Sequence, residues 1–349
     1  MDYIQDTLLK WYTENRRNLP WRHHPTPYQV WLSEVILQQT RVNQGRDYYL
    51  RFIERWPDVE SLAQASEEEV LKMWQGLGYY SRARNLHQCA RQVVEQYGGA
   101  FPADYNKLLK LKGIGTYTAA AIASIAFNLP HAVVDGNVYR VVSRLFDIDA
   151  PINTNEGAAL FAQTADALLN REQPSLHNQA LMEFGALQCT PKSPNCLLCP
   201  LQAQCLAFER QTVMQRPIKL QKLKITTRYF NYLVLRIEDK IYLHKRNDKD
   251  IWKNLYDFPC IETQALTSAE AVMQSQEFKQ LIEDKAFTVS KVSPLFTHKL
   301  THRTLLAQFI EIKLSQELLH IETKDLILTP ERDLGNYPIP RLIDLYLTT

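Results

Sequence analysis

The sequence predicts an all-helical region followed by a smaller α+β region. Apolar residues recur at helical spacing over residues 1–210, whereas aromatic and β-branched residues alternate from about residue 225. A polar stretch rich in Gln and Lys separates the two patterns at 211–224. The chain has 349 residues, 45% of them hydrophobic, which is enough for two or three globular domains. We therefore expect domains at 1–210 and 225–349, joined by a linker.

The helical spacing is clearest at four places in the first region. It occurs at Ile4, Leu8, Trp11 and Tyr12, at Val30, Val35 and Ile36, at Val70, Met73 and Trp74, and at Leu108 and Leu109. Thr26 followed by Pro27, and Ser66 followed by three glutamates, are typical helix starts. The run 118–127 is small and apolar, which predicts a buried helix.

The second region contains alternating segments that predict strands at 229–237, 240–244 and 304–314. Glu238 and Asp239 separate the first two segments by a polar turn, so we expect a hairpin there. Residues 268–284 between these strands predict a helix. Strands interrupted by a helix in this way indicate an α+β domain.

Composition and charge limit the class of protein only loosely. The net charge of +2 neither indicates nor excludes a nucleic-acid partner, because a neutral protein can carry a basic groove. No run of about 18 apolar residues is present, and the N-terminal residues lack the basic and apolar segments of a secretory signal. We expect a cytoplasmic monomer with no membrane contact.

Four of the six cysteines lie close together and predict a metal site. Cys189, Cys196, Cys199 and Cys205 are separated by six, two and five residues. In a cytoplasmic protein such a group indicates metal binding rather than disulfides. One CxxC flanked closely by two further thiols favours an iron–sulfur cluster, with zinc or unliganded thiols as the alternatives.

Two further motifs lie between the N-terminal helices and the cysteines. Gly113 and Gly115 form a tight turn before an alanine-rich helix, where backbone N–H groups can bind a DNA phosphate. An ordinary packing turn between helices would have the same pattern. Asp135 follows two valines and precedes a helix, and on its own this pattern favours a simple N-cap over a functional carboxylate.

The order of these features resembles the endonuclease III superfamily of base-excision DNA glycosylases over at least residues 20–205. The resemblance implies a helix-hairpin-helix fold, with a six-helix module and an iron–sulfur module that holds a [4Fe-4S] cluster at 189–205. Bifunctional members carry a lysine nucleophile two residues after the second glycine, where this chain has Tyr117. Because tyrosine has no amine, no Schiff base with the sugar and no strand cleavage are expected.

Three segments resemble the MutY family of adenine glycosylases within that superfamily. They are WLSEVILQQT at 31–40, NLPWR at 18–22 and QGLGYYSR at 75–82. The family's general acid is the glutamate of the first segment, here Glu34. Without that segment, a lone glutamate in an apolar helix would suggest a structural carboxylate paired with arginine. Lys112 stands where the family usually has proline, and we expect the glycine turn to persist beside it.

The MutY resemblance also implies roles for residues around the adenine. Asp135, ionised, would stabilise the oxocarbenium-like sugar or bond to it transiently, while Tyr117 and Asn137 would orient Asp135, the sugar or the water. The adenine must leave the base stack to reach these groups. The side chains expected to wedge into the duplex are Gln39, Leu77 and Tyr79, and the other DNA contacts are expected at Arg22, Thr40, Gly113 and Gly115.

The segment DIWKNLYDFP at 250–259 resembles the Nudix fold. The magnesium-binding Nudix box requires two glycines, but only Gly335 follows residue 185, so hydrolase chemistry is excluded. In the MutY family such a domain recognises 8-oxoguanine opposite the adenine. Phe296, Thr297 and His298 align with its Phe-Ser-His recognition loop, although a plain β-turn is the alternative. Thr297 keeps the hydroxyl of serine and adds a methyl group.

The sequence therefore predicts a monofunctional glycosylase that removes adenine mispaired with 8-oxoguanine or guanine in double-stranded DNA. In a bacterium it would be cytoplasmic and associated with the nucleoid. Two other functions stay open at this point. One is a bifunctional pyrimidine-lesion glycosylase/lyase of the same fold, which Tyr117 and Glu34 argue against. The other is a non-catalytic iron–sulfur DNA-binding module, which the pair of Glu34 and Asp135 argues against.

Overall fold

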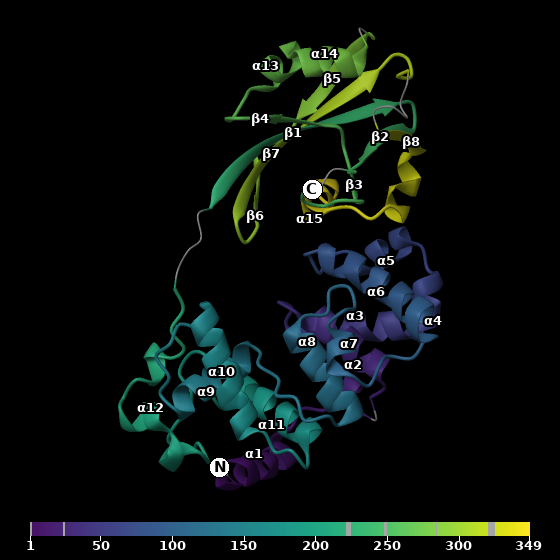
Figure 1. The fold of residues 1–349 in the computed structure, drawn as a ribbon. Helices are drawn as coiled ribbons and strands as arrows, with labels where there is room; N and C mark the ends of the chain where they lie inside the picture. The colour runs from purple at the N-terminus through teal and green to yellow at the C-terminus, as the bar shows by residue number, and fades with distance from the viewer. Residues whose placement is uncertain (1, 24, 221–224, 248–249, 284, 320–324) are drawn as a thin grey trace. The chain divides into compact units, whose positions relative to one another are not determined.

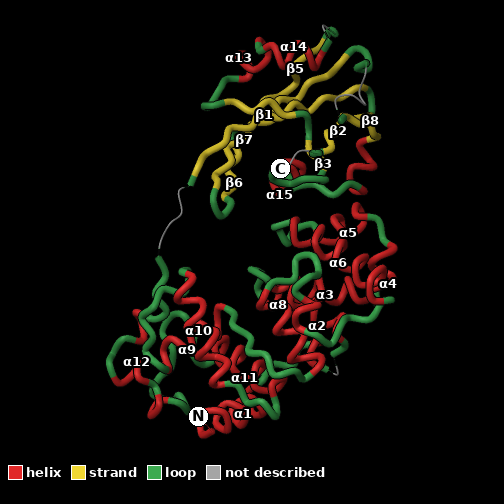
Figure 2. The backbone as a smooth tube through the Cα atoms, viewed as in Figure 1, coloured by secondary structure: helices red, strands yellow, loops and turns green. Residues whose placement is uncertain are grey.

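The computed structural model describes residues 2–23, 25–220, 225–247, 250–283, 285–319 and 325–349, so part of the expected linker, 221–224, lies outside it. The chain forms two compact units. The first comprises Met1–Ala65 and Asn85–Gln221, and the second comprises Ser66–Arg84 and Lys222–Thr349. The first unit is helical and the second contains the sheet (Figures 1 and 2). The expected boundaries at 210 and 225 stay a prediction, to which these contacts add Ser66–Arg84 as part of the second unit.

The first unit consists of helices joined by short turns. These are α1 (Asp2–Asn15), η1 (Pro20–Arg22), α2 (Pro27–Leu37), α3 (Val42–Arg55), α4 (Val59–Gln64), α6 (Ser81–Tyr97, from Asn85 on), α7 (Tyr105–Leu108), α8 (Thr116–Ala121), η2 (Ile122–Ala126), α9 (Gly136–Leu145), α10 (Asn155–Leu168), α11 (Pro174–Leu187), η3 (Gln202–Gln204), α12 (Leu206–Glu209) and η4 (Val213–Gln215). The helix predicted at 118–127 is in fact α8 followed by the π-helical turn η2. No described helix is long and apolar enough to cross a membrane.

Local sequence and packing explain how the first unit is held. Thr26 begins α2 as predicted, because its side chain accepts the Gln29 N–H and Gln29 caps the Thr26 N–H in return. Helix α11 packs against α1 and α9, and it buries Leu181 and Phe184 in a shared apolar core. Gly185 allows the close approach of α11 to α9, since a Cβ there would lie 2.7 Å from the Asn137 Cβ.

The second unit is built on one mixed sheet. Its elements are α5 (Glu67–Trp74), β1 (Thr226–Ile237), β2 (Lys240–Lys245), β3 (Tyr256–Asp257), β4 (Cys260–Thr263), α13 (Ala269–Gln274), α14 (Gln276–Ile282), β5 (Phe287–Val292), β6 (Phe296–Lys299), β7 (Arg303–Leu314), β8 (Leu326–Pro330), η6 (Glu331–Asn336) and α15 (Arg341–Leu347). The main strand order is β3-β2-β1-β7-β5, with β4 on β1, β6 on β7 and β8 on β2. Only the β1–β7 pair is parallel among the described strands.

Helices cover both faces of this sheet (Figure 1). Tyr232 and Val234 of β1 pack with α15 on one face, whereas Leu233 and Leu235 pack with α13 and α14 on the other. The predicted β1–β2 hairpin is confirmed by the antiparallel pairing of these strands. The helical structure predicted at 268–284 is confirmed, but it is divided into two helices, because Ser275 ends α13 and its side chain caps α14 by accepting the Phe278 N–H.

The segment Ser66–Arg84 is attached to the second unit by hydrogen bonds to its backbone. Lys72 Nζ donates to the Tyr337 carbonyl at 2.9 Å, and the Tyr80 hydroxyl donates to the Ile339 carbonyl at 3.2 Å. Arg84 Nη1 donates to the Lys253 carbonyl at 2.8 Å. The segment with the sequence QGLGYYSR therefore belongs structurally with the C-terminal part of the chain.

Candidate active site and cysteine-lined cavity

The first unit contains a cavity of about 530 Å³ between η1, α2, α8, the start of α9 and α11. It brings together residues that lie far apart in the sequence. The predicted site residues on its wall are Arg22, Glu34, Gln39, Thr40, Tyr117, Asp135 and Asn137. Leu77, Tyr79 and the predicted recognition tripeptide lie in the second unit instead.

Glu34 is a buried carboxyl group on α2. Its neighbours Leu32, Val35 and Ile36 belong to the apolar core, and Glu34 itself is only 9% exposed. This burial raises the pKa of Glu34 to about 7, although the hydrogen bond that the Tyr117 hydroxyl donates to Glu34 Oε2 opposes the rise. A group with this pKa can hold a proton near neutral pH and release it to a base in the cavity.

Asp135 is the N-cap of α9, as the alternative interpretation of the sequence expected, and it also lines the cavity. Its Oδ1 accepts the Val138 N–H at 2.7 Å, and its Oδ2 accepts from Asn137 Nδ2 at 2.8 Å. Burial raises the pKa of Asp135, while these hydrogen bonds favour its ionised form and oppose the rise. The cap therefore fixes a carboxylate on the cavity that Glu34 also lines, so that Asp135 can be both an N-cap and a site residue.

A third carboxylate, Glu183 on α11, was not found from the sequence. It is 1% exposed and accepts hydrogen bonds from Arg17 Nη2 at 2.7 Å and from Arg22 Nη2 at 2.9 Å. Burial raises the pKa of Glu183, but the two arginines outweigh it and lower the pKa to about 2. Arg22, expected to contact DNA, thus forms a buried ion pair on the cavity wall. A lone glutamate in the apolar run at 180–184 was the available signal, and that pattern suggests a structural carboxylate paired with arginine, as Glu183 is.

Two of the expected wedge residues lie on left-handed backbone. Gln39 follows α2 with φ of 56° and is exposed, and Tyr79 has φ of 48° and is 48% exposed. Such conformations are uncommon outside glycine and persist only where the surroundings fix them. Leu77, the third expected wedge residue, is 7% exposed in this structure.

The glycine turn is present, but it does not line the cavity. Gly113 has φ of 76°, and a Cβ there would lie 2.7 Å from the Asn85 Cβ, so both the conformation and the close approach require glycine. Gly115 is the N-cap of α8. The Lys112 N–H donates to Gln92 Oε1 at 2.7 Å, a bond that proline could not make, which explains how lysine fits beside the turn.

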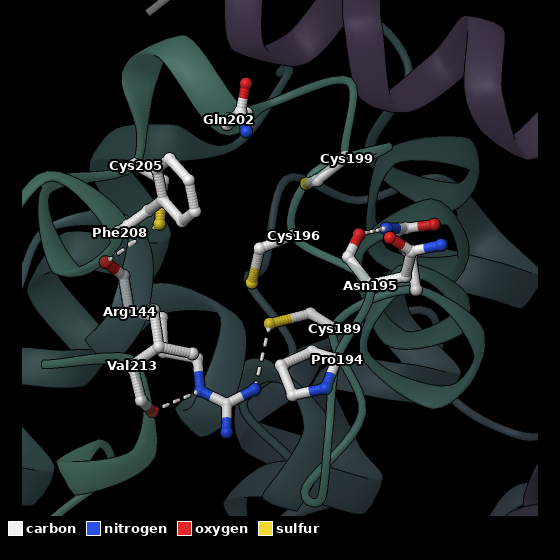
Figure 3. Close-up of a pocket in the computed structure, with 11 residues that line it drawn as sticks. Arg144, Cys189, Pro194, Asn195, Cys196, Cys199, Gln202, Cys205, Phe208 and Val213 are labelled. Carbon is white, nitrogen blue, oxygen red and sulfur yellow. Dashed lines mark hydrogen bonds between the residues drawn. The ribbon is translucent and has the colours of Figure 1, made fainter. Parts of the chain in front are cut away.

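The four clustered cysteines surround a second, smaller cavity (Figure 3). None of the four forms a disulfide. Arg144 Nη1 donates to Cys189 Sγ at 3.4 Å, and its Nη1 also donates to the Thr190 carbonyl, so a cation lies beside the thiols. Within the described residues, no three His, Cys, Asp or Glu side chains are grouped closely enough to hold one metal ion. Four sulfurs on a common cavity nevertheless provide the soft donor set that iron–sulfur clusters use.

The predicted recognition tripeptide forms most of β6 in the second unit. Phe296 points inward and its ring lies 5.3 Å from that of Phe309. Thr297 is exposed, and His298 is half-buried beside Trp252. The segment is therefore part of a strand paired with β7 rather than a plain β-turn.

Comparison with known proteins identifies both parts of the chain. Residues 32–166 match the HhH-GPD superfamily of base excision DNA repair proteins, and residues 231–349 match the NUDIX domain. The adenine DNA glycosylase of Buchnera aphidicola (strain Bp) is 35% identical over 304 residues, covering 86% of this chain and 83% of the relative. The chain belongs to the adenine DNA glycosylase family.

Other comparisons agree with membership of the adenine DNA glycosylase family. The human adenine DNA glycosylase is 45% identical over 217 residues, covering 59% of this chain and 40% of that protein. A thermostable thymine-DNA glycosylase of known structure is 30% identical, with a TM-score of 0.56, and covers 60% of this chain and 96% of its own. The expected helical glycosylase fold and Nudix-like domain are thus confirmed, as is an enzyme of base-excision repair that hydrolyses an N-glycosidic bond.

The raised pKa of Glu34 predicts a pH-dependent effect on stability. A carboxyl whose pKa rises from 4.5 to about 7 on folding stabilises the fold at low pH, and this contribution is lost as the pH rises through 7. Glu34→Gln removes that titration. The free energy of unfolding of the variant, relative to wild type, should therefore increase by about 3 kcal/mol from acidic to mildly alkaline pH. Urea denaturation at both ends of this range measures the difference, and a pH-independent difference would contradict the assignment.

Proposed function

We propose that this chain releases adenine mispaired with 8-oxoguanine or guanine and leaves the DNA strand uncut. The observation that carries the proposal is the opposition of two carboxyl groups in one cavity, with the buried Glu34 protonated near neutral pH and Asp135 held by hydrogen-bond donors. Two carboxyl groups whose environments give them different charges can act as acid and as cation stabiliser at a glycosidic bond.

In this mechanism Glu34 supplies the proton that makes adenine a leaving group. The extrahelical adenine enters the cavity, and the Glu34 carboxyl donates its proton to adenine N7. The N-glycosidic bond then breaks, and its electron pair stays with adenine. The Tyr117 hydroxyl, which donates to Glu34 Oε2, holds the carboxyl in one orientation throughout.

Asp135 stabilises the sugar cation that this cleavage leaves behind. Asn137 keeps the carboxylate in place through its 2.8 Å hydrogen bond to Oδ2, and Arg140 Nη2 holds Asn137 Oδ1 at 2.9 Å. Water then attacks C1′ of the sugar cation, forms the new C–O bond, and gives up a proton to the Asp135 carboxylate, which returns it to solvent. No lysine lines the described cavity, and Tyr117 occupies the position of the lyase nucleophile, so the product is an intact abasic strand.

The remaining expected DNA contacts belong to this proposal too. Gln39, Leu77 and Tyr79 enter the duplex around the mispair, and Leu77 becomes exposed when it does so. Thr40 and the backbone of Gly113 and Gly115 contact the strand that carries the adenine. Thr297, exposed on β6, reads the opposite base through its hydroxyl group.

The four cysteines suit a [4Fe-4S] cluster, which would fix the 189–205 loop in shape. Cys189, Cys196, Cys199 and Cys205 would each supply one thiolate. Arg144 would offset part of the resulting negative charge through its contact with Cys189 Sγ. The proposed reaction uses no chemistry from the cluster.

Glu34→Gln tests the acid role directly. Glutamine keeps the size of the side chain but has no proton to donate, so single-turnover adenine release should fall by at least about 100-fold. In the wild type, release should slow above pH 7, because the carboxyl loses its proton there. Quenched single-turnover assays on an A:8-oxoguanine duplex measure both effects. Binding of the duplex by the variant is the control. A rate of adenine release within about tenfold of the wild-type rate would show that Glu34 is not the general acid.

Cys199→Ser tests the metal site. The wild type should carry about four irons per chain and absorb broadly in the visible range, and the variant should lose iron or soluble yield. Cys260→Ser, which changes a cysteine of β4 in the other unit, is the matched control and should keep the iron. Elemental analysis after anaerobic purification from iron-rich medium identifies the bound metal. Zinc in stoichiometric amount would contradict the assignment of an iron–sulfur cluster.

Thr297 variants test recognition of the opposite base. Thr297→Ala removes one hydrogen-bonding hydroxyl, so the preference for A:8-oxoguanine over A:G should fall about two- to tenfold. Thr297→Ser keeps the hydroxyl and should keep the preference. The measured quantity is the ratio of single-turnover rate constants on the two duplexes. Equal ratios for wild type and Thr297→Ala would show that this hydroxyl does not read the base.

A further inference from the structure

Trp252 occupies a constrained position in the second unit. It lies between β2 and β3 with φ of 62°, and Asn254 two residues later has φ of 63°. A bulky side chain on left-handed backbone is a true outlier, and such residues cluster at ligand clamps and switch regions. The position therefore needs an explanation from its surroundings.

Hydrogen bonds within the 250–255 loop fix this conformation. Arg246 Nε donates to the Ile251 carbonyl at 3.1 Å, and the Arg246 N–H donates to the Leu255 carbonyl at 3.0 Å. The Asn254 N–H donates back to the Arg246 carbonyl at 2.6 Å. Three hydrogen bonds to Arg246 therefore hold the backbone that carries the indole.

Asp250 ties the same loop to the hairpin that contains the recognition strand. Its carboxylate pairs with Arg228 of β1 at 2.7 Å and with Arg303 at 3.1 Å. Arg303 begins β7, directly after the β6–β7 turn. The loop and the β6–β7 hairpin are therefore held together by charge on the side where β6 ends.

The indole of Trp252 reaches the recognition strand itself. Its centroid lies 6.1 Å from the His298 ring and 6.4 Å from the Phe230 ring of the core. His298 directly follows Thr297, the exposed residue proposed to read the opposite base. Trp252 also lines a cavity of about 620 Å³ within the second unit, together with Tyr79 and the 299–303 turn.

We propose that Trp252 is a positioning residue that sets specificity for the base opposite the adenine, acting through His298. This inference rests on the proposed role of Thr297. The indole supports the imidazole of His298 against the core, which fixes the end of β6 and the direction in which Thr297 presents its hydroxyl. Trp252 needs no contact with the base to have this effect.

The test is a double-mutant cycle in the full-length, metal-loaded protein. Trp252→Ala should lower the ratio of A:8-oxoguanine to A:G excision rate constants about three- to tenfold, the effect expected for one lost aromatic contact. Trp252→Phe, which keeps a ring, should restore most of the ratio. His298→Ala should lower the ratio similarly, and adding Trp252→Ala to His298→Ala should lower it no further, because both act through one path.

Two controls separate positioning from general damage. Phe287→Ala removes a partly exposed ring that packs on Phe278 in the same unit, away from His298, and it should leave the ratio unchanged. Thermal unfolding of each variant reports folding. If Trp252→Ala does not fold, Trp252→Leu, which fills part of the same space without an aromatic ring, takes its place.

The outcomes distinguish this inference from the proposed function. An unchanged ratio in Trp252→Ala, independent effects of Trp252 and His298, or an equal loss in Phe287→Ala would each overturn the positioning role alone, provided that Thr297→Ala still lowers the ratio. A wild-type protein with no preference, or a preference that does not depend on Thr297, would overturn the proposed recognition and this inference together.

Discussion

The removal of the Glu34 carboxyl from water is the constraint on which the candidate site depends. Burial of Glu34 among the core residues of α2 penalises its charged form and raises its pKa. The same cavity holds Glu183, which is also buried but keeps its charge because Arg17 and Arg22 both bind it. Asp135 lies between these extremes, with backbone and amide donors but no direct ion pair. Partners, and not burial alone, decide which of the three carboxyl groups carries a proton.

The candidate site requires close packing of the helices that carry its side chains. Asn137, which donates to Asp135, packs directly against α11 at Gly185, where a Cβ would lie 2.7 Å from the Asn137 Cβ. Tyr117 reaches Glu34 from α8, whose start is set by the turn at Gly113, another position where a Cβ would collide. Gly113 and Gly185 therefore affect the candidate site indirectly, because they influence the positions of the helices that carry its side chains.

Motifs in the sequence indicated Glu34, Tyr117 and Asp135 as candidate site residues, but they did not indicate the residues that surround them. Glu34, Tyr117 and Asp135 lie together as the MutY resemblance implied, because each is local to a recognisable segment. Glu183 was missed because its pairing with Arg17 and Arg22 joins residues more than 160 positions apart, which periodicity cannot show. The break between α13 and α14 has a different cause, since Ser275 suits both a helix interior and a cap, and only the tertiary fold selects the cap.

The division of the chain into units changes how recognition and chemistry relate. Gln39 lies on the unit that carries Glu34 and Asp135, whereas Leu77 and Tyr79 belong to the unit that carries Thr297. The Tyr79 hydroxyl bonds to Thr301 in the β6–β7 turn, so this proposed wedge residue and the proposed reader of the opposite base share one support. If Tyr79 enters the duplex beside the mispair, as proposed, then the hairpin proposed to read the partner base also positions Tyr79. The proposed recognition of the opposite base and the proposed insertion of Tyr79 would then be parts of one event, whereas the cavity that holds Glu34 and Asp135 belongs to the other unit.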